Sequence, residues 1–268
     1  MNTLTENDTF HSDKVTVYNR VPKVTADFWL IKLMAVTVGE TAADFLATNL
    51  GLGLSGTSMI MSGILAAALV LQFAQKKYVP WIYWVAVVLV SIVGTLITDN
   101  LIDNLGISLS TTTIAFSLAL SATFIVWYRY EKTLSIHTIF TTRREAFYWL
   151  AILFTFALGT AAGDLLAEGM GLGYLYSGLM YGAIIAVITS AYYFLKLNGI
   201  LAFWLAYIIT RPMGASFGDL LSQPIANGGL GFGTVITSLI FLVSIAAIIA
   251  YMTTHHEGLE SSDASQQD

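Results

Sequence analysis

The sequence predicts an all-α integral membrane protein whose eight transmembrane helices form four parallel two-helix repeats. Three observations lead to this fold class: the composition, the length of the apolar runs, and a spacing of Trp, Gly and Asp that recurs four times. Because each repeat contains two spans, every repeat starts on the same side of the bilayer. The repeats are therefore expected to be pseudo-symmetric about the membrane normal rather than inverted.

The composition favours a lipid environment. Hydrophobic residues make up 56% of the chain and charged residues 11%, and the mean hydropathy is +0.72. Soluble domains are typically about one quarter charged, so a soluble protein of this length would have too few charges to cover its surface. The absence of Cys excludes disulfides, thiolate metal sites and thiol catalysis. The expected partner is the lipid bilayer, and no nucleic acid is expected.

The recurring spacing is W-x9-G-x4-D, and it predicts four tandem units. A second Gly follows the Asp by seven residues in three copies, at Gly51, Gly106 and Gly171. The fourth copy is looser and reaches Gly229 after an insertion that contains Pro224. The marks of the four units are Trp29, Gly39 and Asp44; Trp84, Gly94 and Asp99; Trp149, Gly159 and Asp164; and Trp204, Gly214 and Asp219.

This pattern resembles a bacterial family of multi-pass membrane proteins with four tandem two-helix repeats, each carrying a characteristic Trp, known only as a repeat of unknown function. The resemblance covers about residues 26–252. It implies an integral membrane location and a repeat architecture, and it implies no substrate. Function therefore has to be inferred from the residues.

The chain begins with a polar segment, residues 1–25, that is expected to be cytoplasmic and loosely ordered. The apolar run that follows is too long for the core of a cleavable signal, so it is expected to be a retained helix. Each unit then supplies two continuously apolar runs of about 20 residues, the length of a helix that crosses a bilayer. Pro212 is expected to kink the seventh helix.

The expected repeats occupy about 26–74, 79–129, 145–195 and 199–252. Their spans are 26–46, 55–74, 79–101, 109–129, 145–167, 175–195, 199–221 and 232–252. Residues 253–268 are polar and acidic and are predicted to form a disordered tail.

The connections between spans differ in charge, which predicts the orientation. The short connections around Gly51, Gly106, Gly171 and Gly229 contain no Lys or Arg. By the positive-inside rule, these turns face out, and both termini lie in the cytoplasm of a bacterial inner membrane. The connections after the even-numbered spans hold the basic residues Lys76, Lys77, Arg129, Lys132, Arg143, Arg144 and Lys196.

Each odd-numbered span ends in a polar stripe, because residues four apart share one face of a helix. Carboxylates inside a bilayer are costly, about 2.5–3.5 kcal/mol each near a helix centre, and usually face a bundle interior or water. Stripes that meet on one axis would need a cation or shared protons. The stripes are Glu40, Asp44 and Thr48; Thr95, Asp99 and Asp103; Thr160, Asp164 and Glu168; and Ala215, Asp219 and Gln223.

Two interpretations of these stripes remain open. In the functional one, the four repeated Asp residues ligate a metal ion, and Glu40, Asp103, Glu168 and Arg211 complete the binding site. In the structural one, the Asp side chains cap the Gly-rich turns or the following helices. The extra acids vary between units, which a repeated folding device would not require, so the functional interpretation is favoured. The two middle units, which have the densest acids, are expected to matter most.

The available ligands narrow the ion. All four His residues lie in the tails or in a cytoplasmic connection, at His11, His137, His255 and His256, and the chain has no Cys. Carboxylate, hydroxyl and carbonyl oxygens suit Mg, Ca or Mn rather than Zn or Cu. No resident cofactor is expected, and a divalent cation is an expected substrate.

Two cations interrupt the apolar spans. Arg211 is predicted to pair with an acid of a neighbouring stripe, with competition for the cation site or anion binding as the alternatives. Lys32 is expected to extend to the cytoplasmic surface. The repeated Gly residues are expected to permit close helix packing, with an opening of the backbone toward a ligand as the alternative. The repeated Trp residues are expected to pack between units, with a belt at the membrane interface as the alternative.

The leading functional hypothesis is a secondary transporter or exporter of a cation, which would be a hard divalent metal such as Mn or Mg, protons, or both. A passive channel and an accessory membrane protein remain alternatives, as does an organic cation as the substrate. An enzyme is not expected, because the sequence contains no nucleophile–base arrangement, phosphate-binding Gly loop or zinc signature. The oligomeric state is left open.

Overall fold

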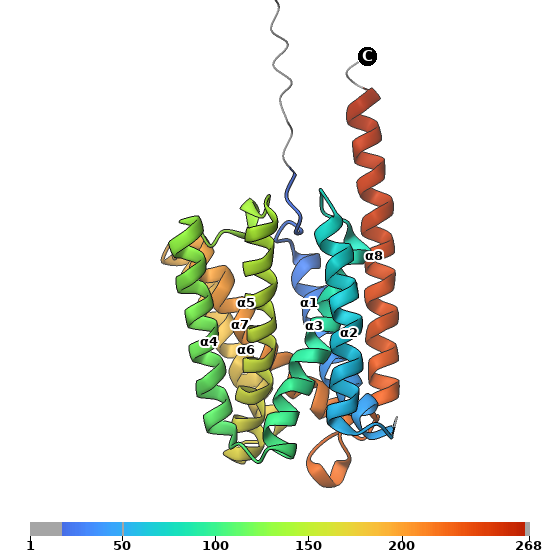
Figure 1. The fold of residues 1–268 in the computed structure, drawn as a ribbon, viewed down its shortest axis with the longest axis vertical. Helices are drawn as coiled ribbons and strands as arrows, with labels where there is room; N and C mark the ends of the chain where they lie inside the picture. The colour runs from blue at the N-terminus through green and yellow to red at the C-terminus, as the bar shows by residue number, and fades with distance from the viewer. Residues whose placement is uncertain (1–17, 50, 266–268) are drawn as a thin grey trace, which may run out of the picture.

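The structure is a computed structural model that describes residues 18–49 and 51–265, with side chains up to residue 253, and this part of the chain is helical (Figure 1). Each of the eight expected spans coincides with one long helix, and the seventh continues without interruption through Pro212. The helices are α1 (Ala26–Asn49), α2 (Gly53–Ala74), α3 (Pro80–Asp99), α4 (Leu109–Glu131), α5 (Thr142–Asp164), α6 (Tyr174–Phe194), α7 (Gly199–Ser222) and α8 (Thr234–Ser265). The interpretations of His11, His255 and His256 lie outside the described side chains.

The four odd-numbered helices form a closed inner ring. α1 packs against α3, α3 against α5 and α5 against α7, and α7 returns to α1. The repeated Gly is the point of close approach at each step, since a Cβ atom at Gly39, Gly94, Gly159 or Gly214 would collide with the next helix of the ring. The prediction that these Gly residues serve close packing is therefore confirmed.

The even-numbered helices form an outer layer, and each packs mainly on the inner helix of the following repeat. α2 lies on α3, α4 on α5 and α6 on α7, while α8 closes the circle by packing on α1. Figure 1 shows α4 beside α5 at one side of the bundle, and α2 beside α3 at the other. Neighbouring repeats are thus joined by the contact of each outer helix with the next repeat, as well as by the inner ring.

Seven helices in the described part of the chain are long and apolar enough to cross a membrane. α1 is outside this set although it has 24 residues, because Lys32, Glu40 and Asp44 interrupt its apolar surface. Three helices, α3, α7 and α8, pack against α1, and Lys32 and Glu40 are buried. Its polar residues therefore lie inside the bundle.

The turns between the paired helices explain the second Gly mark of the repeats. Gly51, Gly106 and Gly171 have φ angles of 66°, 66° and 68°. This left-handed region is costly for residues with a Cβ atom and readily adopted by Gly. The recurring Gly therefore allows the chain to reverse direction after each of the first three inner helices.

Aromatic side chains fill the ring at the end where the odd-numbered helices begin. Trp84, Trp149 and Trp204 are buried, and Trp29 is half-buried. Each follows a Phe or Tyr, and the hydroxyls of Tyr83 and Tyr148 lie 2.5 Å apart. The predicted packing of Trp between repeats is confirmed. We refer to Phe28, Tyr83, Tyr148 and Phe203, with the four repeated Trp residues, as the aromatic layer.

The N-terminal segment is more ordered than its composition predicts. The side-chain amide of Asn19 donates to the carbonyl of Ile136 at 3.0 Å and its oxygen accepts from the amide of Ile139 at 3.1 Å. Arg20 forms an ion pair of 2.8 Å with the buried Glu145 of α5. The expectation of a loosely ordered segment is thus wrong from Asn19 onwards, because these polar side chains satisfy buried groups of the α4–α5 connection.

Replacing Asn19 by Ala is expected to lower the free energy of unfolding by about 1–3 kcal/mol, because the two buried groups that it satisfies lose their partner. Unfolding of the detergent-solubilised protein by sodium dodecyl sulfate, followed by Trp fluorescence, measures the change. Asn227→Ala, at an exposed position, is the matched control and is expected to have no effect. Equal stabilities of the two variants would contradict the assigned role of Asn19.

The C-terminal helix is longer than predicted. α8 continues to Ser265, although the sequence predicts disorder from residue 253, and it projects beyond the other helices (Figure 1). An existing helix gains a backbone hydrogen bond with each added residue, whereas only its first turn is costly to form. The apolar part of α8 therefore supports a polar helical extension that would not form alone.

Candidate cation site

Residues at equivalent positions of the four inner helices lie in one layer across the ring, and successive layers are four residues apart, as the stripes predict. The seventh residue after each repeated Trp gives one buried layer, and the eleventh gives the next. The fifteenth residue is the repeated Asp. These layers are Val36, Ser91, Phe156 and Arg211; then Glu40, Thr95, Thr160 and Ala215; then Asp44, Asp99, Asp164 and Asp219.

A cavity of about 310 Å³ opens at the end of the ring opposite the aromatic layer. A water molecule occupies about 30 Å³ in the liquid, so the cavity could hold about ten waters or a cation with its hydration shell. All of the acids in the predicted stripes line this cavity: Glu40, Asp44, Asp99, Asp103, Asp164, Glu168 and Asp219.

Two of the inner helices change their winding at the cavity. α3 and α5 continue into the π-helical turns η1 (Asn100–Asn104) and η3 (Leu165–Gly169), directly after their repeated Asp. These turns carry Asp103 and Glu168, which are exposed at the mouth of the cavity. Such turns are frequent at functional sites, and no sequence motif marks them here.

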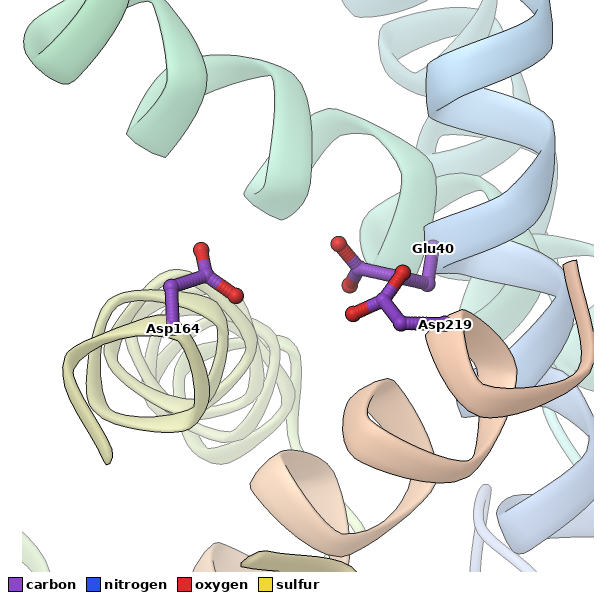
Figure 2. Close-up of side chains that lie close together, drawn as sticks. All are labelled: Glu40, Asp164 and Asp219. Carbon is purple, nitrogen blue, oxygen red and sulfur yellow. The ribbon is translucent and has the colours of Figure 1, made fainter. Parts of the chain in front are cut away.

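Three carboxylates gather at the deep end of the cavity. One oxygen from each of Glu40, Asp164 and Asp219 lies within 4.8 Å of the other two. Figure 2 shows the carboxylates of Glu40 and Asp219 next to each other, with that of Asp164 facing them across an open space. They come from α1, α5 and α7, so the group exists only when three repeats are assembled. We call these residues the carboxylate trio.

Arg211 crosses the axis of the ring below the trio. Its Nη2 atom lies 2.9 Å from Oε2 of Glu40 and 2.7 Å from Oγ1 of Thr160, and it also contacts Oγ1 of Thr95. One nitrogen of α7 thus reaches the three other inner helices. The predicted ion pair between Arg211 and an acid of a neighbouring stripe is confirmed.

The acids differ in how far protein groups satisfy them. Glu168 accepts a hydrogen bond of 2.9 Å from Tyr174, and Asp44 accepts one of 3.3 Å from Gln223. No described residue donates a hydrogen bond to the carboxylates of Asp99, Asp103, Asp164 or Asp219, and Asp219 is the most buried of the four, with 6% of the residue exposed. A buried carboxylate without a protein donor is costly, which makes Asp219 the acid that most needs a ligand or a proton.

The arrangement modifies the predicted ligand set. Asp164 and Asp219 belong to the carboxylate trio, whereas Asp44 and Asp99 line the same cavity outside it. Glu40 replaces them because it lies one helical turn deeper and is held by Arg211. The trio draws on the first, third and fourth units, and the expectation that the two middle units matter most stays a prediction.

Lys32 does not extend to the surface, so that expectation is wrong. Its side chain is fully buried, and Nζ donates a hydrogen bond of 2.8 Å to the backbone carbonyl of Tyr207. Nζ also lies 3.9 Å from the centre of the Tyr207 ring. The face of an aromatic ring attracts a cation, and α7 supplies both this ring and the carbonyl oxygen. This holds Lys32 inside the ring.

Comparison with known proteins identifies the repeats. A family model described as "Repeat of Unknown Function (DUF347)" matches four consecutive segments, residues 28–78, 82–133, 147–198 and 202–256. Each matched segment contains one inner and one outer helix. No curated protein and no solved structure matches the chain.

Proposed function

We propose that this chain, which belongs to the DUF347 repeat family, is a secondary transporter that binds a cation at the carboxylate trio. The substrate would be a hard divalent metal ion such as Mn²⁺ or Mg²⁺, with protons as a competing or exchanged ion. The four repeats would be pseudo-symmetric about the membrane normal. The protein would lie in a bacterial inner membrane with both termini in the cytoplasm and the acidic cavity facing out.

The observation that carries this proposal is the convergence of three carboxylates on one point at the deep end of the cavity. Ionised, they bring three negative charges, and Arg211 neutralises one of them. The remaining two negative charges match a divalent ion. Carboxylate and hydroxyl oxygens are the ligands that Mg²⁺, Ca²⁺ and Mn²⁺ prefer.

The interior of the ring favours a transporter over an open channel. Below the trio, Arg211 occupies the axis, and the aromatic layer fills the opposite end of the ring. A passive cation channel needs a continuous path, and a fixed positive charge on that path opposes cations. Transfer of an ion past Arg211 would require the guanidinium group to move, as expected for a gated transport cycle.

The proposal predicts a saturable stabilisation of the folded protein by one divalent ion, because a ligand that binds only the folded state stabilises it by mass action. At a concentration one hundred times the dissociation constant, this stabilisation is about 2.7 kcal/mol. Thermal unfolding of the detergent-purified protein, followed by Trp emission, would be measured against Mg²⁺, Ca²⁺, Mn²⁺, Zn²⁺ and Na⁺. We expect Asp219→Asn to abolish the response.

Asp27→Asn serves as the matched control, because Asp27 is exposed at the start of α1, far along the helix from the trio. It should retain the full ion response. No response of the wild-type protein to any of these ions would contradict the metal proposal and favour an accessory role or an organic cation. An unchanged response in Asp219→Asn would place the ion elsewhere.

A further inference from the structure

Lys32 is a buried amine without a carboxylate partner. No acid among the described residues lies within ion-pair distance of its Nζ atom, whose hydrogen-bond partner is the carbonyl of Tyr207. The rings of Tyr207 and Phe156 lie 3.9 and 6.0 Å from it. An ammonium group that is removed from water without a counter-ion is strongly disfavoured, and lysines in such places readily become neutral.

The charged group that acts on Lys32 from the helices around it is Arg211 of α7. α3 and α5 place Tyr83 and Tyr148 one turn away in the aromatic layer. α2 and the described side chains of α8 contain no Asp, Glu, Lys or Arg. Lys32 and Arg211 are thus two buried cations, and of the two only Arg211 has a carboxylate partner, Glu40.

Two hydroxyl groups next to this pair are available for proton transfer. The hydroxyls of Ser91 and Tyr207 and the Nε and Nη1 atoms of Arg211 are buried without a hydrogen-bond partner among the described residues. All lie in the layers of Lys32 and Arg211, between the aromatic layer and the trio. The two hydroxyls can each accept and donate a proton next to Lys32, whereas the guanidinium group of Arg211 only donates hydrogen bonds.

A cation at the trio would change the charge around Lys32 in two ways. Lys32 precedes Glu40 by eight residues, about 12 Å along the helix. At that distance and an effective dielectric constant of about 20, each unit of positive charge lowers the proton affinity about tenfold, or about a hundredfold for a divalent ion. The ion also competes with Arg211 for Glu40, which leaves the guanidinium charge uncompensated beside Lys32.

We propose that Lys32 is the proton-exchange site of this protein, so that binding of a divalent cation at the carboxylate trio releases a proton from the Lys32 ammonium group. The inference rests on the proposed cation site and adds the coupled ion. On cation binding the N–H bond breaks, the electron pair remains on Nζ as a neutral amine, and the proton passes to water. Reprotonation of Lys32 favours release of the cation, which makes the cycle a cation–proton exchange.

The test measures proton release when Mn²⁺ is added to the detergent-purified protein in a weak buffer containing a pH indicator, over a series of pH values. Wild-type protein is expected to release protons in proportion to bound Mn²⁺, which is measured in parallel by equilibrium dialysis. Metal binding can also displace protons from carboxylates, so the variants decide the source.

Lys32→Met, which keeps the length of the side chain, is expected to bind Mn²⁺ and to release fewer protons than wild type. At the pH where this difference is largest, it is expected to be about one proton per bound Mn²⁺. Lys77→Met, in the exposed α2–α3 connection, is the control and should match wild type. Lys32→Arg fixes the charge and is expected to weaken Mn²⁺ binding up to a hundredfold relative to Lys32→Met.

Two kinds of failure are distinguishable. If wild-type protein does not bind Mn²⁺, the proposed cation site and this inference both fall. If it binds Mn²⁺ without releasing protons, or if Lys32→Met binds and releases as wild type does, the cation site stands and Lys32 is not the exchange site. The wild-type measurement alone can overturn the proposal even if a variant does not fold.

Discussion

Replacing Glu40 by Gln is expected to lower the free energy of unfolding by about 3–5 kcal/mol, because it leaves the partner of a buried ion pair as an uncompensated charge. Glu40 and Arg211 are 2.9 Å apart, with side-chain exposures of 6% and 0%. Gln keeps the size of the side chain and an oxygen that can accept from Thr95, so the loss reports on the charge. Unfolding by sodium dodecyl sulfate in mixed micelles, followed by Trp fluorescence, measures it.

The double variant Glu40→Gln/Arg211→Met is expected to recover most of this loss, because it removes the stranded guanidinium as well. Replacing a buried ion pair by residues of similar volume is often neutral or stabilising. Glu168→Gln is the matched control, since Glu168 is exposed at the mouth of the same cavity and should change stability little. A double variant as unstable as Glu40→Gln would show that the charge of Arg211 is not the cause.

Replacing Gly159 by Ala is expected to lower the free energy of unfolding by about 1–3 kcal/mol, the usual cost of overpacking a closely packed interior. A Cβ atom at this position would collide with Cβ and Cγ of Arg211 and lie 3.1 Å from Cδ of Pro212. These atoms are close to the backbone of α7 and cannot move away independently. The same micelle unfolding measurement applies, and α5 and α7 would have to separate.

Gly163, one turn further along α5, provides a control with the opposite expected sign. The nearest atom to a Cβ at Gly163 is Cα of Pro212 at 3.6 Å, an ordinary contact distance. Gly163→Ala should therefore gain the helix preference of Ala over Gly, up to about 1 kcal/mol. If the two substitutions have the same effect, close approach at the repeated Gly does not determine the packing of the ring.

The sequence was sufficient to predict the helices and the height of each polar residue along them. A four-residue spacing places Glu40, Asp44 and Thr48 on one face, and the repeated Asp fixes the same height in every unit. The seven acids accordingly line one cavity, as the stripes predict. This part succeeded because helical periodicity and the length of an apolar run can both be read from the local sequence.

The detailed composition of the trio and the position of Lys32 could not be predicted in the same way. Both depend on how far a long side chain reaches across the ring to another helix. Arg211 extends over Gly159 to Glu40, and Lys32 turns inward to a carbonyl and an aromatic ring of α7. Spacing along one helix contains no information on these cross-ring contacts.

The sequence also does not predict which inner helix each outer helix packs on. An apolar surface on α2 or α6 is compatible with packing on its own repeat or on the next one, and the structure shows the latter. The repeated Asp does not predict the π-helical turns either. Such turns follow Asp99 and Asp164, but none follows Asp44 or Asp219 in the described residues. Tertiary packing selects among such locally equivalent alternatives.

The packing of α8 on α1 has a consequence for synthesis of the protein. α1 is synthesised before the other seven described helices, and it is the one of the eight that is not apolar enough to cross a membrane, because of Lys32, Glu40 and Asp44. Its neighbours α3, α7 and α8 arrive later, and α8 is the last. Membrane insertion of the first helix and completion of the fold are therefore separated by translation of nearly the whole chain. During that interval, Lys32, Glu40 and Asp44 lack the helices that surround them in the completed fold.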